Sequence, residues 1–427
     1  MGITMKDLYT LHIPAGAPLL GSLTLTGSKS ESNRALLLQA LACAQSGQAF
    51  RVGRVRRLAS ARDTQTLLRL LQTPEAAVWD VLDAGTTMRF LTAYAATQLR
   101  NKTLTGTPRM QERPIGILTE ALAQLGAEIE YLGKPGYPPI RLNATRPFTQ
   151  KTQQLSIDGS VSSQFVSALL MVAPTLPLGL SLRLVGHIAS RPYLEMTLAQ
   201  MKAFGVNHKW EGDSIHIQPQ TYQEADFAVE ADWSGASYWY SLVALRPGSR
   251  LQLQGLKPRS LQGDQAISRL MQPLGVNTTP TADGMLLEHT FHPAAAMPQV
   301  WDFDRCPDLA QTVLACAAAK GVAMPRIVGL ESLRIKETDR IAAMQAELQK
   351  LGADLQALDA HTWALVPPTQ PLPERLQIHT YDDHRMAMAF APLAACIAEV
   401  LIDDPQVVAK SYPGFWDDLR SLGVEVA

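Results

Sequence analysis

One short pattern recurs five times along this chain, and it constrains the fold more than any other feature. Each copy has an amphipathic stretch of helical period, a Leu-Gly or Phe-Gly pair, a small residue and an alternating run. The pairs are Leu125-Gly126, Phe204-Gly205, Leu274-Gly275, Leu351-Gly352 and Leu422-Gly423. Glycine directly after a helix is typical of the left-handed residue that ends it. The run after the first pair, residues 128–131, alternates with the period of a half-buried strand.

The spacing of these copies predicts the architecture. They lie about 70 to 80 residues apart, which is too long for a solenoid repeat and suits a βαβαββ unit. A degenerate sixth copy is expected between Leu67 and Val81, where Leu70-Leu71-Gln72-Thr73 replaces the glycine pair. Six units fill 427 residues. We therefore predict an α/β (α+β) protein with two pseudo-symmetric domains of three units each.

Composition excludes several classes of protein. A hydrophobic content of 46% with 18% charged residues is that of an ordinary globular chain, and a net charge of −1 favours neither nucleic acid nor an anionic membrane as partner. Cys43, Cys306, Cys316 and Cys396 show no metal-site spacing, so free thiols in a reducing cytoplasm are expected, with no metal and no cofactor. The first ten residues lack the core of a signal peptide, and the apolar run 387–398 is too short to cross a bilayer.

A polar turn, residues 27–34, opens a very apolar helix and carries Lys29 and Arg34. Helix N-termini expose unpaired N–H groups and the positive end of the dipole, so this turn suits an anion. It is not a nucleotide-binding P-loop, because Ser28 separates Gly27 from Lys29 and no glycine stands at the required earlier position. From these residues alone, a capped buried helix with two solvated cations is an equal alternative.

Three further strand-to-helix turns resemble the first. They are residues 83–89, which end at Arg89, residues 160–165, and residues 190–193 with Pro192 suited to a first helical turn. A proline-bounded loop, residues 106–114, adds Arg109 and Arg113 as a possible clamp for a carboxylate or phosphate. A surface ion pair with Glu112 is the alternative there. Together these turns predict a polar, basic cleft.

The C-terminal half carries acidic and basic groups side by side. Lys336 and Arg340 are four residues apart and are predicted to share a helix face, where an anion would bridge them. The alternative is that these side chains form solvated ion pairs, Glu337 with Arg340 and Lys336 with Asp339, and bind no anion. Residues 382–385 open another apolar helix and place His384 and Arg385 toward a site. Asp308 and Lys410 complete the set, although Asp308 could instead cap a helix.

Five sequence blocks, in order, carry a family resemblance. They are Gly-Ser-Lys-Ser-x-Ser-Asn-Arg, Ala-Gly-Thr-x-Met-Arg, Pro-Arg-Met-x-Glu-Arg-Pro, Lys-Glu-Thr-Asp-Arg and Asp-His-Arg-Met-Ala-Met. The chain closely resembles the EPSP synthases, the 3-phosphoshikimate 1-carboxyvinyltransferases. The resemblance implies an inside-out α/β barrel in each of two hinged domains of three βαβαββ units. It implies one discontinuous domain of residues 1–27 and 232–427 and an inserted domain of residues 28–231.

The implied reaction transfers the enolpyruvyl group of phosphoenolpyruvate to the 5-hydroxyl of shikimate 3-phosphate, by addition and elimination through a tetrahedral ketal. Positions matching the family's shikimate 3-phosphate contacts are Lys29, Ser30, Arg34, Ser162, Ser163, Gln164, Ser190, Tyr193, Asp308 and Lys336. Those matching its phosphoenolpyruvate contacts are Lys29, Gly85, Arg113, Gln164, Arg340, Arg385 and Lys410, and Arg89 lies in the same turn as Gly85. Clamping two anions together supplies proximity and charge stabilisation without a metal.

The resemblance also implies which groups move protons. Asp308 is expected as the base for the 5-hydroxyl and Glu337 as the leading acid for the methylene carbon, with Lys29 and His384 close in proton transfer. Two carboxylates with opposite roles require environments that separate their pKa values.

Four positions depart from the family pattern. Thr26 stands where proline is frequent, Asp83 replaces asparagine and would need a partner such as Arg89, Phe90 replaces proline, and Ser332 replaces an asparagine found in some members. The changes at 90 and 332 leave the affinity for substrate and for glyphosate open.

Two other functions compete with this interpretation. UDP-N-acetylglucosamine enolpyruvyl transferases share the fold, but they carry a reactive cysteine in a loop that corresponds to residues 106–116, which contain none. A non-catalytic anion-binding protein would not need both Asp308 and Glu337. A single domain of a larger multifunctional enzyme is disfavoured because the repeats fill the chain. A monomer is expected by default.

Overall fold

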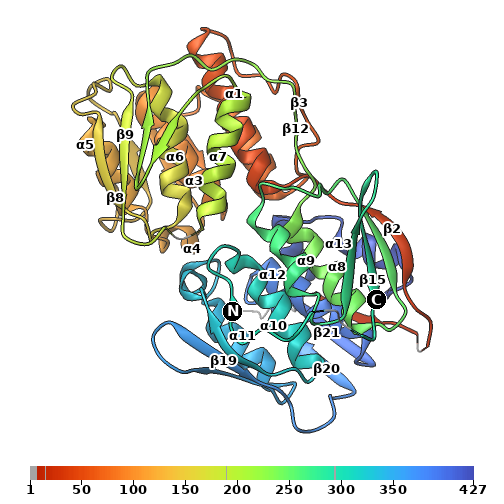
Figure 1. Ribbon diagram of the computed structural model, residues 1–427. Helices are drawn as coiled ribbons and strands as arrows, with labels where there is room; N and C mark the ends of the chain where they lie inside the picture. Colours follow the sequence, from red (N-terminus) through yellow and green to blue (C-terminus); the bar gives the residue numbers. More distant parts are fainter. Residues whose placement is uncertain (1–6, 15, 189, 293–294) are drawn as a thin grey trace. The chain divides into compact units, whose positions relative to one another are not determined.

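The computed structural model describes residues 7–14, 16–188, 190–292 and 295–427, and it divides into two compact units (Figure 1). Unit 1 consists of the described residues of Met1–Thr26 and Glu230–Ala427, and unit 2 of those of Gly27–Val229. Each unit buries its own hydrophobic cluster. A separate apolar core is the hallmark of a domain that can fold on its own.

Unit 2 contains two complete βαβαββ repeats. The first has β4 (Val78–Asp80), α3 (Gly85–Gln98), β5 (Lys102–Thr105), the short α4 (Pro108–Gln111), α5 (Gly116–Leu125), β6 (Ile129–Tyr131) and β7 (Ile140–Leu142). The second has β8 (Gln154–Asp158), α6 (Ser163–Val172), β9 (Leu180–Val185), α7 (Arg191–Ala203), β10 (Lys209–Glu211) and β11 (Ser214–Ile217). In both sheets the first two strands are parallel and the closing hairpin is antiparallel, in the orders β4-β5-β7-β6 and β8-β9-β11-β10.

Unit 1 contains three repeats, two of which borrow a strand from the N-terminal segment. The first has β2 (Leu20–Thr24), α8 (Trp233–Leu245), β13 (Arg250–Gln254), α9 (Ile267–Leu270), β14 (Val276–Pro280) and β15 (Gly284–His289). The second has β16 (Trp301–Asp302), α10 (Ala310–Ala319), β17 (Met324–Val328), α11 (Arg340–Gln349), β18 (Asp354–Ala357) and β19 (Thr362–Val366). The third has β20 (Arg375–Ile378), α12 (His384–Phe390), β21 (Glu399–Asp403), α13 (Phe415–Ser421), β22 (Glu425–Val426) and β1 (Leu8–His12).

These borrowed strands explain why the N-terminal segment belongs to unit 1. Strand β2 pairs in parallel with β13, and β1 pairs antiparallel with both β21 and β22. Without them two four-stranded sheets would each lose a strand and expose unpaired backbone groups, which is costly.

The sixth repeat is present only in reduced form. It consists of α1 (Lys29–Gln45), β3 (Val55–Arg56), α2 (Arg62–Gln72) and β12 (Phe227–Ala228), and its described residues form one parallel strand pair, β3 with β12, without a closing hairpin. The strand at Val78–Asp80, expected as the end of the degenerate copy, instead opens the next repeat as β4. The prediction for residues 67–81 was wrong in that respect, because Thr73 ends α2 without a left-handed glycine and the chain passes directly to a new sheet.

The five glycines of the repeated pattern adopt the expected left-handed backbone. Their φ angles are 120°, 85°, 94°, 81° and 86° at Gly126, Gly205, Gly275, Gly352 and Gly423. At Gly126 a β-carbon would also stand 2.0 Å from the carbonyl oxygen of Thr149. At Gly126, Gly205 and Gly423 the glycine lies at the helix C-cap or directly after it. At Gly275 and Gly352 it lies in the turn that follows the C-cap of α9 and α11. Strands β6, β10, β14, β18 and β22 follow these glycines.

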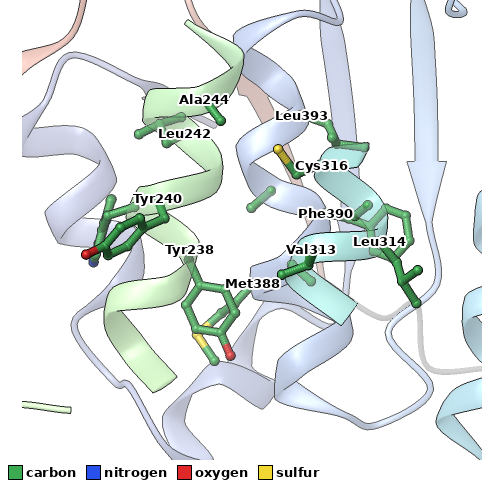
Figure 2. Packing of buried hydrophobic residues seen from close by; sticks show 14 of the residues in the cluster. Tyr238, Tyr240, Leu242, Ala244, Val313, Leu314, Cys316, Met388, Phe390 and Leu393 are labelled. Carbon is green, nitrogen blue, oxygen red and sulfur yellow. The ribbon is translucent and has the colours of Figure 1, made fainter. Parts of the chain in front are cut away.

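Helices buried on nearly all sides form the middle of each unit. In unit 2, α1, α3, α6 and α7 pack against one another (Figure 1). In unit 1, α8, α10 and α12 pack through residues such as Tyr238, Val313, Met388 and Phe390 (Figure 2). Helices this apolar all round belong in a protein core. Within the described ranges, no helix has both the length and the apolar character needed to cross a membrane.

Candidate active site

The first turns of several unit 2 helices meet through polar contacts. Ser28 caps α1 by accepting from the Glu31 amide, 3.4 Å away. Lys29 opens the helix, and its Nζ lies 3.0 Å from Oδ2 of buried Asp63 at the start of α2. The Thr87 hydroxyl of α3 donates to the Asp63 carbonyl at 3.3 Å. Lys29 is therefore held by a carboxylate that the sequence did not single out, because Asp63 lies in no recognisable motif.

Arg34 points into the protein. Its guanidinium donates to the Thr197 hydroxyl at 2.7 Å, to the Ser30 carbonyl at 2.9 Å and to the Ser167 hydroxyl at 3.1 Å. Burial lowers the pKa of Arg34 to about 10, with Tyr193 opposing the shift. The side chain remains charged at neutral pH and ties α1 to α6 and α7. The sequence predicts that Arg34 contacts a ligand, whereas these hydrogen bonds give Arg34 a structural role between the three helices.

Arg89 and Arg113 flank the first turn of α3. Arg89 donates to the Pro114 carbonyl at 2.8 Å and to the Gly85 carbonyl at 3.3 Å, so it fixes the loop that carries Arg113. A β-carbon on Gly85 would stand only 2.7 Å from Nη1 of Arg113. The absence of a side chain at Gly85 therefore leaves the space in which the Arg113 guanidinium lies.

The remaining unit 2 candidates stand at the starts of α6 and α7. Ser162 caps α6, Ser163 is its first residue, and Gln164 donates to the Thr86 hydroxyl of α3 at 3.2 Å. Ser190 precedes α7 with a φ of 52°, a conformation uncommon for a residue with a side chain. Tyr193, in the first turn of α7, lies near the Arg34 guanidinium, with 5.8 Å from its ring centre to Cζ.

Gly85→Ala is expected to displace the Arg113 guanidinium and to raise the KM for the anionic substrate expected at Arg113 by about tenfold, the cost of one charged hydrogen bond. The overall fold should persist, because the clash meets the end of a flexible side chain. Steady-state kinetics with each substrate varied in turn would measure it. Gly116→Ala, at the first residue of α5, is a matched control whose β-carbon has nothing nearer than 3.4 Å. An unchanged KM in Gly85→Ala would contradict the inference that Gly85 leaves space for the Arg113 guanidinium.

In unit 1, three carboxylates from three segments surround one buried guanidinium. Arg340, the first residue of α11, donates from Nε to Oδ2 of Asp383 at 2.6 Å and from Nη1 to Oδ1 of Asp308 at 2.9 Å. Its Nη2 reaches Oε2 of Glu337 at 2.9 Å. Burial opposes the charged form, but Asp383, Glu337 and Asp308 outweigh it and raise the pKa of Arg340. A buried charge of this kind is tolerated only when it is fully paired.

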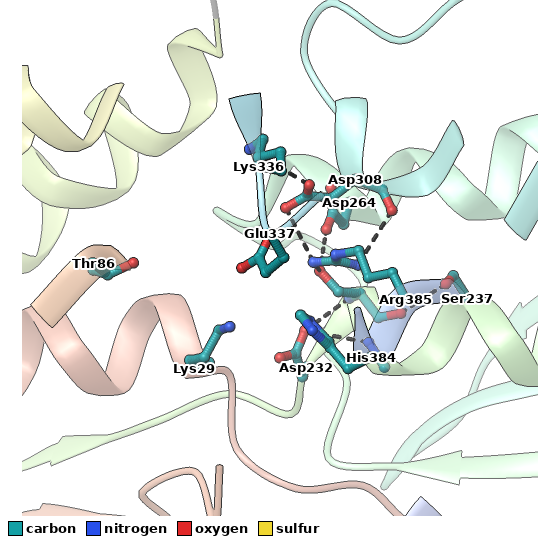
Figure 3. A network of polar contacts seen from close by, with 12 residues as sticks. Lys29, Thr86, Asp232, Ser237, Asp264, Asp308, Lys336, Glu337, His384 and Arg385 are labelled. Atoms are coloured by element: carbon teal, nitrogen blue, oxygen red, sulfur yellow. Dashed lines mark hydrogen bonds and ion pairs between the residues drawn. The ribbon is translucent and has the colours of Figure 1, made fainter. Parts of the chain in front are cut away.

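Asp308 links Arg340 to the second guanidinium of the group, Arg385. Nη2 of Arg385 lies 3.0 Å from Oδ2 of Asp308, and Nζ of Lys336 lies 3.6 Å from Oδ1 (Figure 3). Burial alone would raise the pKa of Asp308, but Arg385, Lys336 and Arg340 together hold it well below its usual value. Asp308 is therefore ionised at neutral pH and able to accept a proton. It belongs to the turn Pro307–Leu309 and does not act as the helix cap considered above.

Lys336 and Arg340 do not share a helix face, so that prediction was wrong. Lys336 follows the short 3₁₀ turn Glu331–Ile335, and α11 begins only at Arg340 because Asp339 caps it. The two cations meet instead at Oδ1 of Asp308. The expected pair of Glu337 with Arg340 is present, and Asp339 pairs with exposed Arg334 at 3.5 Å.

His384, Glu337 and Lys410 complete the group. Nζ of buried Lys410 lies 3.5 Å from Oε1 of Glu337, so this carboxylate is shared between two cations. His384 is buried at the start of α12, with Nδ1 3.5 Å from Oδ1 of Asp383. Asp383, which the sequence analysis did not single out within residues 382–385, caps α12 through the Arg385 amide and also binds Arg340.

The structure also shows the contacts of Arg109 and of three positions that depart from the family pattern. Arg109 forms the surface ion pair with Glu112, at 3.0 Å. Asp83 accepts from Arg62 at 2.9 Å, a different residue from the suggested Arg89. Phe90 is buried with its ring centre 5.4 Å from Cζ of Arg34, and Ser332 is exposed. Among the described residues, no group of three or more His, Cys, Asp or Glu side chains is arranged to hold a metal ion.

Similarity to known proteins identifies the family of the chain. The sequence profile of the EPSP synthase (3-phosphoshikimate 1-carboxyvinyltransferase) family matches residues 13–419. The chain belongs to the EPSP synthase family. It is 44% identical to the 3-phosphoshikimate 1-carboxyvinyltransferase of Bacteroides fragilis strain ATCC 25285, over 97% of this chain and 98% of that one. The enzyme of Salmonella typhimurium strain LT2 is 36% identical over 94% and 96%.

The fold is also that of a solved EPSP synthase. The structure from Acinetobacter baumannii superposes with a TM-score of 0.77 and covers 99% of this chain and 100% of that one, at 19% sequence identity. The two-domain α/β architecture expected from the repeats is confirmed by this likeness.

Proposed function

We propose that this chain transfers the enolpyruvyl group of phosphoenolpyruvate to the 5-hydroxyl of shikimate 3-phosphate and releases phosphate, as its family membership indicates. The observation that carries the proposal is the meeting of Asp308 and Glu337 at one buried arginine, Arg340, with Arg385, Lys336 and Lys410 around them. A pure anion-binding protein needs the cations but gains nothing from two carboxylates that neutralise them.

The reaction needs one base and one acid. We assign Asp308 to accept the 5-hydroxyl proton as that oxygen bonds to C2 of phosphoenolpyruvate, and Glu337 to deliver a proton to C3, which gives the tetrahedral ketal. Loss of a proton from C3 and departure of phosphate then form the product. As the substrate anions take over Lys336, Arg340 and Arg385, the pKa of Asp308 rises from its depressed value and the carboxylate becomes a better base.

The cations hold the two anionic substrates. We assign Lys29, Arg113, Arg340, Arg385 and Lys410 to phosphoenolpyruvate, and Lys336 with the hydroxyl groups of Ser30, Ser162, Ser163 and Ser190, and Gln164 and Tyr193, to shikimate 3-phosphate. Lys29 and His384 assist proton transfer. Developing negative charge is stabilised by side chains that are already ionised and positioned. We also propose a cytoplasmic, monomeric enzyme.

The test is phosphate release from phosphoenolpyruvate, with shikimate 3-phosphate present and absent. We expect phosphate only when both substrates are present, and its loss in Asp308→Ala. Tight binding of both substrates by the wild-type chain without phosphate release would refute the transferase and favour a binding protein.

A further inference from the structure

A second buried aspartate lies beside the group around Asp308, and the roles assigned above do not use it. Asp264, in the 3₁₀ turn Gly263–Ala266, is 2% exposed. Its Oδ2 accepts a hydrogen bond from the Ser234 hydroxyl in the first turn of α8. Its Oδ1 is buried, and among the described residues it has no hydrogen-bond partner. A half-satisfied buried carboxylate costs stability, so its retention needs a reason.

Ser234 connects this aspartate to Arg385. Nη2 of Arg385 lies 3.4 Å from the Ser234 oxygen, and Nη1 lies 3.4 Å from the Tyr238 hydroxyl one turn further along α8. When Asp264 is ionised, it takes the Ser234 proton in a hydrogen bond, so the serine oxygen presents a lone pair to the guanidinium. The guanidinium is thereby held from two sides, by Asp308 and by Ser234. Figure 3 shows Asp264 and Asp308 near the Arg385 guanidinium.

The groups that face Asp264 set its titration. Burial comes first, followed by the negative charge of Asp308, and together with Asp232 at the cap of α8 they raise the pKa of Asp264 to about 7. Arg385 and the Ser234 hydrogen bond act in the opposite direction. The Cys306 thiol also lies nearby, with its own pKa raised by burial and then by Asp264.

We propose that Asp264 is a positioning residue that orients Arg385 through the Ser234 hydroxyl for binding of phosphoenolpyruvate. The proposal rests on the assignment of Arg385 to that substrate. In this proposal Asp264 acts on the substrate only through Ser234 and Arg385, so its effect should appear in the affinity for one substrate and in the pH dependence, with the chemical step nearly unchanged.

Kinetics of Asp264→Asn test this role, because asparagine keeps the shape but cannot ionise, and its NH₂ group can donate to the Ser234 oxygen and occupy the lone pair that faces Arg385. We expect the KM for phosphoenolpyruvate to rise about tenfold, the loss of one charge-assisted contact, with the KM for shikimate 3-phosphate unchanged. In the wild type, kcat/KM for phosphoenolpyruvate should rise with pH through an inflection near 7, and the variant should lack that inflection. Equal changes in both KM values, or an inflection that persists in the variant, would overturn the proposal.

Ser234 supplies an independent check. Ser234→Ala should raise the same KM, Ser234→Thr should restore it by returning the hydroxyl, and Asp264→Asn combined with Ser234→Ala should be no worse than Ser234→Ala alone. Additive effects would mean that the two residues act separately. Glu347→Gln is the matched control: Glu347 is also a buried carboxylate of unit 1, but it pairs with Lys350 at 2.6 Å and Tyr381 at 2.7 Å, away from Arg385. It should lower the melting temperature and leave both KM values unchanged.

Thermal melting separates this proposal from the assigned activity. The folded-state pKa of Asp264, about 7, lies above the ordinary value of 3.8, so the neutral form stabilises the fold and this contribution is lost as the pH rises through 7. The melting temperature of Asp264→Asn relative to wild type should therefore increase from pH 5 to pH 8. A constant difference would refute the titration of Asp264 whether or not the chain releases phosphate, and a chain that shows the shift but releases none would refute the activity alone.

Discussion

Glu337→Gln is expected to lower kcat by about 10²- to 10⁴-fold, the usual contribution of a positioned general acid. Glutamine retains the size of the side chain and an oxygen that can accept from Arg340 at the 2.9 Å position, so the buried arginine stays partly paired. What the variant lacks is the proton that Glu337 is proposed to deliver to C3 of phosphoenolpyruvate. The loss should therefore appear in kcat, with KM values changed much less.

Single-turnover measurements with both substrates would show whether the missing step is the addition. A matched control is Glu331→Gln, an exposed carboxylate in the 3₁₀ turn that precedes Glu337. It pairs with His361 at 3.1 Å on the surface, and its replacement should leave kcat unchanged. A kcat for Glu337→Gln within threefold of wild type would remove Glu337 from the role of acid and leave Lys29 or His384 as the proton donor.

Asp383→Ala is expected to produce the largest loss of stability. Asp383 is fully buried and accepts two hydrogen bonds from Arg340, at 2.6 and 3.2 Å, and one from the Arg385 amide at 2.9 Å. Removal of one partner from a buried ion pair costs about 3–5 kcal/mol, because the other charge is left in a poorly solvated position. The free energy of unfolding, measured with urea, should fall by an amount of that order.

Asp339→Ala separates the loss of a helix cap from the loss of the buried pair. Asp339 caps α11 through the amides of Ile341 and Ala342, each at 3.1 Å, and its only ion pair among those described is the exposed one with Arg334. Loss of such a cap costs about 1 kcal/mol, and an exposed pair adds less than that. If Asp383→Ala were no more destabilising than Asp339→Ala, the remaining carboxylates, Asp308 and Glu337, would suffice to hold Arg340.

Local sequence signals were sufficient for the five copies of the glycine pattern and for several helix starts. A left-handed glycine after a helix is decided by neighbouring backbone atoms, and all five copies of the pattern behave accordingly. The helix starts at Ser28, Ser162 and Asp383 were also predictable, because a capping side chain bonds to amides two or three residues away. Five sequence blocks of specific composition were enough to indicate the family.

Contacts between distant segments were beyond such signals. Nothing local indicates that Asp63 holds Lys29, since the two lie 34 residues apart, or that Asp264 bonds to Ser234, 30 residues away. The shared helix face of Lys336 and Arg340 was a reasonable inference from spacing, but the cap at Asp339 begins the helix later. Arg34 was expected to face an anion, whereas its guanidinium donates hydrogen bonds to buried hydroxyl groups of α6 and α7.

The sequence by itself determined the repeat, the left-handed glycine turns that follow its helices and the kinds of side chain that gather at the helix starts. The tertiary structure alone decided which carboxylate neutralises which cation, because that depends on burial and on chain segments brought together by the packing of α8, α10, α11 and α12. Electrostatic energies inside a protein depend steeply on distance and solvent exposure. A linear sequence fixes the charges that are available, and only the folded chain fixes those two quantities.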